Sequence, residues 1–189
     1  MVQVIKSGRN GNTAEVNDEG ELLTYAITED AIIRKALESQ SYVITSPIIT
    51  LTSASLSYVL YIENTDTVPW IITDAFPRYG TSTGGAGDFT TSTIVGPTGG
   101  TLLSAGTAFF PGNLNVARQV PLNGTFLYGA EGSTATGTGS TILIPESRNV
   151  VNPSPIILES GASLATGVQP PAGNTSMRVQ FFYLMIRGE

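Results

Sequence analysis

The sequence predicts an all-β fold: a jelly-roll-like antiparallel β-sandwich with an N-terminal arm. Threonine, serine and glycine supply 24, 17 and 21 of the 189 residues, a composition rich in strand-forming and turn-forming residues. About ten short runs of β-branched and aromatic residues recur at a spacing of roughly 8–12 residues, which is typical of a sandwich. The length suits one such domain. We therefore divide the chain into an arm, residues 1–40, and a sandwich domain, residues 41–189.

The arm is distinguished by its clusters of acidic residues, at positions 17–21 and 29–30. Residues 13–16 and 21–27 indicate the two strands of a hairpin, with Gly20 supplying the positive φ that such turns favour. Residues 29–38 fit a short helix capped by Thr28, with Ile33 spaced to stack on Leu37. The same stretch also fits an extended arm, because so short a helix depends on tertiary contacts. This would be the only helix of the chain.

Strand-forming runs alternate with turns from residue 41 onward. Pro69 marks an edge strand or the start of a strand, because proline cannot donate to the ladder. Loops or turns are expected at the glycine-rich residues 80–88, 96–100 and 129–139. The expected strands are Tyr42–Thr45, Pro47–Thr52, Ser57–Ile62, Val68–Ile72, Thr93–Val95, Thr101–Leu103, Phe126–Tyr128, Thr141–Ile144, Pro155–Leu158, Ala162–Ala165 and Met177–Ile186.

The final run, Met177–Ile186, carries the strongest single signal. Alternate residues from Met177 to Met185 fall on one face, and Phe182, Leu184 and Ile186 fall on the other. Because the second half is apolar on both faces, exposing either face would invite aggregation. We expect a central strand that is covered on both sides.

The composition argues against most chemical functions. The chain has no histidine and no cysteine, so the commonest general base, the commonest metal ligand and the sulfur nucleophile are missing. Nine basic against fifteen acidic residues give a net charge of −6, which argues against a nucleic-acid partner. No apolar run approaches the roughly 18 residues of a membrane helix, and the start lacks the apolar stretch of a secretory signal. We expect a protein that is not an enzyme, carries no cofactor or metal and binds neither nucleic acid nor membrane.

Three weaker chemical signals have simpler structural explanations. Asp88 follows a Gly-Gly-Ala-Gly run that would suit calcium, but the oxygen ligands nearby are too few and a plain turn is favoured. Aromatic residues on strands line carbohydrate platforms in some proteins, yet they are more often core residues; here they are Tyr58, Tyr61, Trp70 and Phe76. Two carboxylates would suffice for glycoside hydrolysis, although acids beside glycine and serine are usually solvated; the candidates are Asp74, Asp88, Glu131, Glu146 and Glu159.

Six segments of the sequence carry a resemblance to a known group of proteins: Ile49–Ala54, Val59–Asn64, Gly96–Thr101, Tyr128–Gly132, Gly161–Leu164 and Pro170–Met177. They resemble virion structural proteins of tailed bacteriophages. The likeness spans about residues 48–186 and contains no catalytic motif. The resemblance implies a sandwich subunit that decorates a capsid as a cement protein, located on the virion surface after synthesis in the host cytoplasm. It also implies the major capsid protein as partner. The nearby alternative is a head-fibre or tail attachment protein that binds a receptor or glycan.

A decoration protein bridges neighbouring shell subunits and often forms a closed ring, so we expect a homotrimer. The arm offers the candidate contacts. Short apolar residues near its start would add a strand to a neighbour's sheet, an arginine would reach an acidic partner, and apolar residues near residue 35 would form a patch. An alternative is that all of them fold back on their own sandwich. These assembly candidates are Val2, Val4, Ile5, Arg9, Ile32, Ile33 and Leu37.

Overall fold

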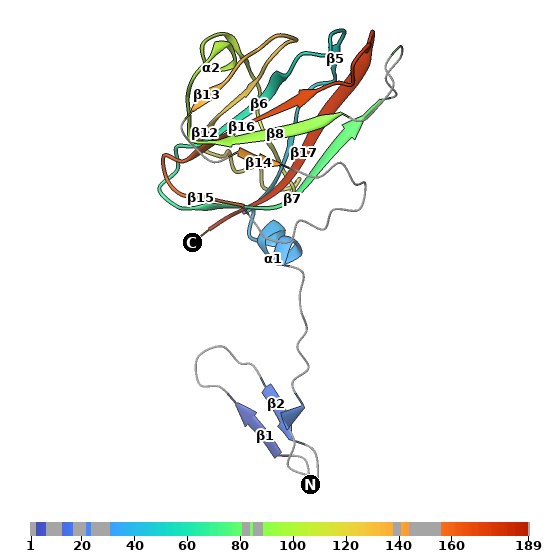
Figure 1. The fold of residues 1–189 in the computed structure, drawn as a ribbon. Coiled ribbons are helices and arrows are strands. Elements are labelled where there is room, and N and C mark those ends of the chain that lie inside the picture. Colours follow the sequence, from blue (N-terminus) through green and yellow to red (C-terminus); the bar gives the residue numbers. More distant parts are fainter. Residues whose placement is uncertain are drawn as a thin grey trace. The chain divides into compact units, whose positions relative to one another are not determined.

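The computed structural model describes residues 3–6, 13–16, 22–23, 31–80, 84, 89–137, 141–143 and 156–188 (Figure 1). The chain divides into two compact units, Met1–Ala31 and Ile32–Glu189. The boundary between the two units lies after Ala31, whereas the predicted arm ends at Gln40. Helix α1 (Ala31–Leu37) therefore lies almost wholly in the second unit.

The first unit contains one three-stranded antiparallel sheet in the order β1-β2-β3. Its strands are β1 (Gln3–Lys6), β2 (Thr13–Val16) and β3 (Leu22–Leu23). The pairing of β2 with β3 confirms the predicted hairpin. The turn at Gly20 and the expected helix start, residues 28–30, lie outside the described residues. The helical alternative for the following residues is confirmed by α1.

The second unit is an antiparallel β-sandwich of two six-stranded sheets (Figure 1). The β6 sheet has the order β10-β12-β6-β16-β8-β14 and contains β10 (Thr107–Ala108), β12 (Gly124–Tyr128), β6 (Ser57–Asn64), β16 (Ser163–Gln169), β8 (Thr90–Val95) and β14 (Thr141–Leu143). The β17 sheet has the order β11-β4-β17-β7-β15, with β5 also paired to β17; it contains β11 (Gly112–Asn113), β4 (Ser41–Thr45), β17 (Met177–Arg187), β7 (Trp70–Tyr79), β15 (Ile156–Leu158) and β5 (Ile49–Leu51). The predicted all-β sandwich is confirmed.

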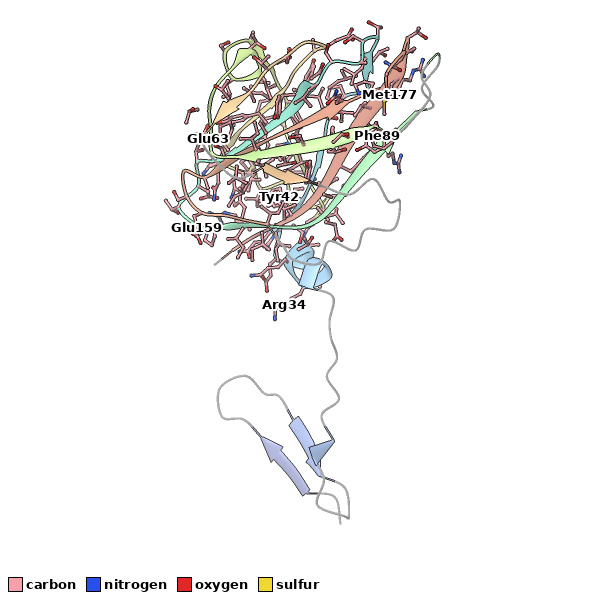
Figure 2. All side chains as sticks on the ribbon, viewed as in Figure 1. Arg34, Tyr42, Glu63, Phe89, Glu159 and Met177 are labelled. Carbon is pink, nitrogen blue, oxygen red and sulfur yellow. The ribbon has the colours of Figure 1, made fainter. Side chains whose placement is uncertain are left out.

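The core lies between these two sheets, where the inward side chains of alternate residues meet (Figure 2). Trp70 of β7 stacks on Phe126 of β12 across the interface, with ring centroids 5.6 Å apart and planes 8° from parallel. Hydroxyl groups also cross the interface. The Tyr183 and Thr166 hydroxyls are 2.9 Å apart, and those of Tyr79 and Thr91 are 2.6 Å apart. Burial raises the pKa of Tyr183 far above its ordinary value, so this phenol stays neutral.

The central position predicted for the last strand is confirmed, because β17 pairs with β4 and β5 on one side and with β7 on the other. The expected cover on both faces is only partly present. Phe182 and Leu184 are half-buried, whereas Ile186 is buried. Among the described strands, β6 and β16 are buried on both faces, and a short helix packs on the outer side of β6. Pro69 precedes the first residue of β7, which confirms it as a strand start rather than an edge.

That short helix, α2 (Thr101–Ala105), corrects two predictions. Residues 101–103 do not form a strand, and the arm helix is not the only helix. Leu102 is fully buried against the tyrosines of β6, Tyr58 and Tyr61. The first turn is held by Thr134, whose backbone oxygen accepts from Leu102 N at 3.0 Å and whose hydroxyl accepts from the Thr101 N–H at 3.1 Å. The preceding turn also differs, because Pro97–Gly99 is strand β9 and pairs with β13 (Thr136–Gly137).

One ion pair closes the end of the sandwich. Arg187 of β17 donates two hydrogen bonds to the Asp66 carboxylate. Arg187 Nε lies 2.5 Å from Asp66 Oδ2, and Arg187 Nη2 lies 2.9 Å from Asp66 Oδ1. Asp66 is buried and also accepts from the Thr67 N–H at 2.8 Å, whereas about a third of Arg187 is exposed. The bonds from Arg187, followed by that from Thr67, hold the pKa of Asp66 below its ordinary value.

This lowered pKa predicts a defined loss of stability in acid. Because the folded state binds the proton of Asp66 less tightly than the unfolded state does, the contribution is complete above the ordinary aspartate pKa of about 3.9 and disappears as the pH falls through the folded-state value. We expect Asp66→Asn to lower the free energy of unfolding by roughly 1–2 kcal/mol at pH 7. The difference between variant and wild type should shrink below about pH 4.

Urea unfolding at a series of pH values measures this effect. Asp74→Asn is the matched control, because Asp74 has no ion pair among the residues that the structure describes. An Asp66→Asn deficit that stays constant from pH 7 to about pH 2 would contradict the assigned role of the ion pair.

Candidate assembly interface

Helix α1 is fastened to the sandwich through its C-terminal end. Ser39 adopts a left-handed conformation with φ 61° and ends the helix. Its carbonyl oxygen accepts from Asn113 Nδ2 at 2.9 Å and from the Tyr42 hydroxyl at 3.2 Å. Lys35 is buried, and its Nζ contacts Gln40 Oε1 at 2.9 Å and Glu38 Oε2 at 3.2 Å. The helix therefore presents a fixed surface at this side of the sandwich.

Residues 107–121, which we call the edge segment, run beside this helix. The segment begins as β10 at the edge of the β6 sheet and continues as β11 at the edge of the β17 sheet, so it crosses from one sheet to the other. Phe109 lies at the crossing and packs against Phe126 and Tyr128 at centroid distances of 6.0 and 6.3 Å. The edge segment thus covers one side of the sandwich, and its Phe109 side chain packs against the core.

Hydrogen bonds join the edge segment to the end of α1. Leu114 N donates to Ser41 O at 2.9 Å, and Asn115 Nδ2 donates to Leu37 O at 3.4 Å. Asn113 Nδ2 also donates to Val120 O at 3.3 Å, which folds the segment back on itself. Hydrogen bonds therefore tie residues 113–120 of the edge segment to the end of the helix and to the start of β4.

Large apolar side chains are exposed on the helix end and on the edge segment. The side chain next to the anchored Phe109, Phe110, is 90% exposed, Val116 is 86% exposed and Leu37 is 68% exposed. Leu114 and Val120 add further exposed apolar area. Large apolar side chains that are exposed close together are typical of an interaction site. We call Leu37, Phe110, Leu114, Val116 and Val120 the apolar edge.

The sequence-predicted candidates are divided between the two units. Val4 and Ile5 lie in β1, opposite Glu15 and Ala14 of β2. Val2 and Arg9 lie outside the described residues. Ile32 and Ile33 lie in α1, and Leu37 is the exposed candidate that joins the apolar edge. The structure thus places Leu37 beside residues of the edge segment that sequence reasoning missed.

A signal for the missed residues does exist in the sequence. Phe109 and Phe110 stand together before Pro111 and Gly112, in a stretch without a strand pattern. A pair of large aromatic residues in a turn cannot both face the same core, so one of them is a candidate for the surface. Which of the two is exposed depends on the crossing between sheets, which only the fold reveals.

The structure also places several of the aromatic and acidic residues that were considered as binding or catalytic candidates. Tyr58, Tyr61 and Trp70 are buried, so they do not form a carbohydrate platform. Asp88 and Glu146 lie outside the described residues. Glu131 is a structural acceptor that binds Thr52 N at 2.6 Å and Ser53 N at 2.5 Å, and these contacts, led by the bond from the Thr52 hydroxyl, lower its pKa.

Among the described residues, no group of three or more acidic side chains lies close enough to hold a metal ion. Over the same part of the chain, neither helix has the length and apolar content needed to cross a membrane.

Comparisons of this chain with protein-family models, with curated proteins and with solved structures find no match.

Proposed function

We propose that this protein is a structural component of a tailed-phage virion that binds the outer surface of the capsid and stabilises it as a decoration protein. The single observation that carries the proposal is the apolar edge, a fixed group of large exposed apolar side chains on one side of a sandwich. The partner under this proposal is the major capsid protein. The sequence resemblance to virion proteins supports the same role.

The fold suits a role in binding rather than catalysis. The exposed side chains sit on a helix end and an edge segment that are tied by hydrogen bonds, so little conformational entropy is lost when a partner covers them. Aromatic anchors such as Phe110 commonly dominate the binding energy of an interface. A rigid surface with an aromatic centre is therefore well suited to repeated contacts on a shell.

The first unit offers a second type of contact. In its three-stranded sheet, β1 lies at an edge and pairs only with β2 among the described strands. A neighbouring subunit would add a strand to such an edge through backbone hydrogen bonds. We propose that the apolar edge binds the capsid shell and that β1 pairs with an adjacent copy of the protein. Pairing of this kind among three copies would form a homotrimer.

Binding to purified shells of the major capsid protein tests the proposal. We expect the wild type to sediment with shells in a saturable manner, and Phe110→Ser and Val116→Ser each to weaken binding by at least about tenfold. Ile157→Ser is the matched control, because Ile157 is 55% exposed on β15, at the opposite edge of the β17 sheet. Both kinds of variant remove an exposed apolar side chain, so their melting temperatures should match that of the wild type.

Two outcomes would overturn this assignment. One is a wild-type protein that does not bind shells, and the other is an Ile157→Ser variant that loses as much affinity as Phe110→Ser. Light scattering on the same samples measures their mass. We expect a trimer for the wild type and for the Phe110→Ser variant, because that variant leaves β1 unchanged.

A further inference from the structure

Asn123 is an exposed asparagine that stands directly before Gly124, the first residue of β12. Residues 119–123 belong to no helix or strand, so no ladder fixes the main chain on the N-terminal side of this pair. Glycine has no Cβ and restricts the main chain least, so its backbone nitrogen can approach the preceding side-chain amide without obstruction. The pair therefore suits a reaction of the chain with itself.

Such a reaction requires a Gly124 N–H that is not held in the sheet. Gly124 stands opposite Asn64 of β6. The backbone of Asn64 faces the other neighbour of β6, since its N–H donates to Ala162 O at 2.9 Å and its carbonyl accepts from Gly161 N at 2.7 Å. Opposite residues of an antiparallel pair alternate between bonded and unbonded positions. Gly124 therefore occupies an unbonded position, and its N–H points away from β6.

The strand on the other side of β12 does not reach this N–H. β10 pairs with the far end of β12, at Leu127 and Tyr128. One residue beyond β10, Phe109 N donates to Phe126 O at 3.1 Å. No acceptor for the Gly124 N–H lies among the residues that the structure describes. The backbone nitrogen is therefore free in the folded protein.

The side-chain amides of the other described asparagines are occupied. Asn64 and Asn174 are buried, and Nδ2 of each donates to backbone carbonyl groups. Asn113 Nδ2 also donates to two backbone carbonyl groups, and Asn115 Oδ1 accepts from two backbone N–H groups. The amide of Asn123 makes no hydrogen bond to any described residue. It can therefore turn toward the next backbone nitrogen without breaking a contact.

We propose that Asn123 is a site of spontaneous deamidation in the folded protein. The Gly124 nitrogen loses its proton to solvent base and attacks Cγ of Asn123, which closes a succinimide ring. The side-chain nitrogen takes up a proton from solvent and leaves as ammonia. Water then opens the ring at either carbonyl, which gives aspartate in one case and isoaspartate in the other. Water is the co-reactant, and nothing is oxidised or reduced.

The products differ from the original chain in charge and in backbone length. Each adds a negative charge to a protein whose net charge is already −6. Isoaspartate also places an additional methylene group in the main chain next to Gly124, whose backbone lies against the Trp70 ring. Deamidation therefore alters a position that contacts the core. This inference is independent of the proposed binding to a capsid.

Peptide mapping by mass spectrometry tests the inference on full-length protein kept in mildly alkaline buffer. We expect loss of the Asn123 amide with accumulation of both aspartate and isoaspartate, while Asn115 and Asn174 keep their amides over the same period. The loss should accelerate as the pH rises, because the attacking nitrogen must give up its proton. Asn123→Gln is the matched control and should keep its amide, because its longer side chain would have to close a larger ring. Asn10 also precedes a glycine, lies outside the described residues and is followed as a separate peptide.

A second measurement separates the effect of the structure from that of the sequence. Urea releases every asparagine from the fold, so Asn174 should lose its amide faster in urea than in the native protein. Because the nitrogen of Gly124 is already free, we expect similar rates of loss at Asn123 in native buffer and in urea. A native rate at Asn123 that is undetectable, or far below the rate in urea, would overturn the proposal. Equal native rates at Asn123 and Asn174 would also overturn it, since the free N–H would then not select the site.

Discussion

Replacing Trp70 by alanine should lower the free energy of unfolding by about 4 kcal/mol, the largest effect that we expect from a single substitution. Trp70 is fully buried at the start of β7 and stacks on Phe126 of the opposite sheet. The indole also lies against Gly124 of β12, where an added Cβ would come within 2.2 Å of its ring. Truncation removes a side chain that joins both sheets, and neighbouring backbone cannot collapse into the space.

Urea unfolding followed by circular dichroism is the suitable measurement, because the variant lacks the only tryptophan of the chain. Trp70→Phe should cost roughly half as much, since a smaller ring still fills part of the space. Phe110→Ala is the matched control. It truncates an exposed aromatic side chain, so a change within about 0.5 kcal/mol is expected.

The contact with Gly124 provides an internal check. Gly124→Ala should destabilise the wild type but cost much less in a Trp70→Ala background, because the ring that the new methyl group would meet is gone. Additive effects of the two substitutions would show that they do not act through the same contact. A Trp70→Ala variant within about 1 kcal/mol of the wild type would contradict the assigned role of the stack.

Replacing Asn64 by alanine should cost about 3 kcal/mol, although the side chain is small and polar. Asn64 is fully buried at the end of β6, and its side chain makes three hydrogen bonds. Nδ2 donates to Val68 O at 2.9 Å and to Leu158 O at 2.8 Å, while Oδ1 accepts from Asp66 N at 2.8 Å. Alanine would leave two carbonyl groups and one N–H without these partners, in the part of the sandwich where the β6–β7 turn meets β15.

Asn64→Asp separates the donors from the acceptor. The new carboxylate keeps an oxygen for Asp66 N but faces the two carbonyl oxygens without a proton to share, so at pH 7 we expect a loss at least as large as that of Asn64→Ala. Acidification protonates this carboxylate and restores one donor, so the deficit should narrow as the pH falls. Asn123→Ala, at an exposed asparagine, is the control and should change stability by less than about 0.5 kcal/mol. An Asn64→Ala variant as stable as that control would refute the proposed hydrogen-bond node.

Elements with a strong local sequence pattern were predicted correctly, because their structure depends little on residues far away in the sequence. The alternation in residues 177–186 identified β17 as a strand, and Pro69 marked the start of β7, because both signals depend on backbone geometry alone. Residues 101–103 were wrongly predicted to form a strand for the opposite reason. Two leucines after glycine suit either a strand or a helix, and the choice depends on Thr134 and the tyrosines of β6, which lie far away in the sequence.

The candidate sites required the fold even more strongly. Leu37 was identified because it continues the apolar pattern of a predicted helix. Phe110 was missed because its exposure is a property of the crossing between two sheets. Pairing across a sandwich is non-local, and a single sequence carries little information about it.

The two short strands of the edge segment bear on how this protein behaves when it is concentrated. A long bare strand at the rim of a sheet recruits identical molecules by backbone pairing, and this growth has no natural end. Here β10 and β11 each contribute only two residues before the chain turns away. Association on that side must therefore proceed through side chains that match a specific surface. We therefore expect no fibre growth through this edge of the sandwich when the protein is concentrated.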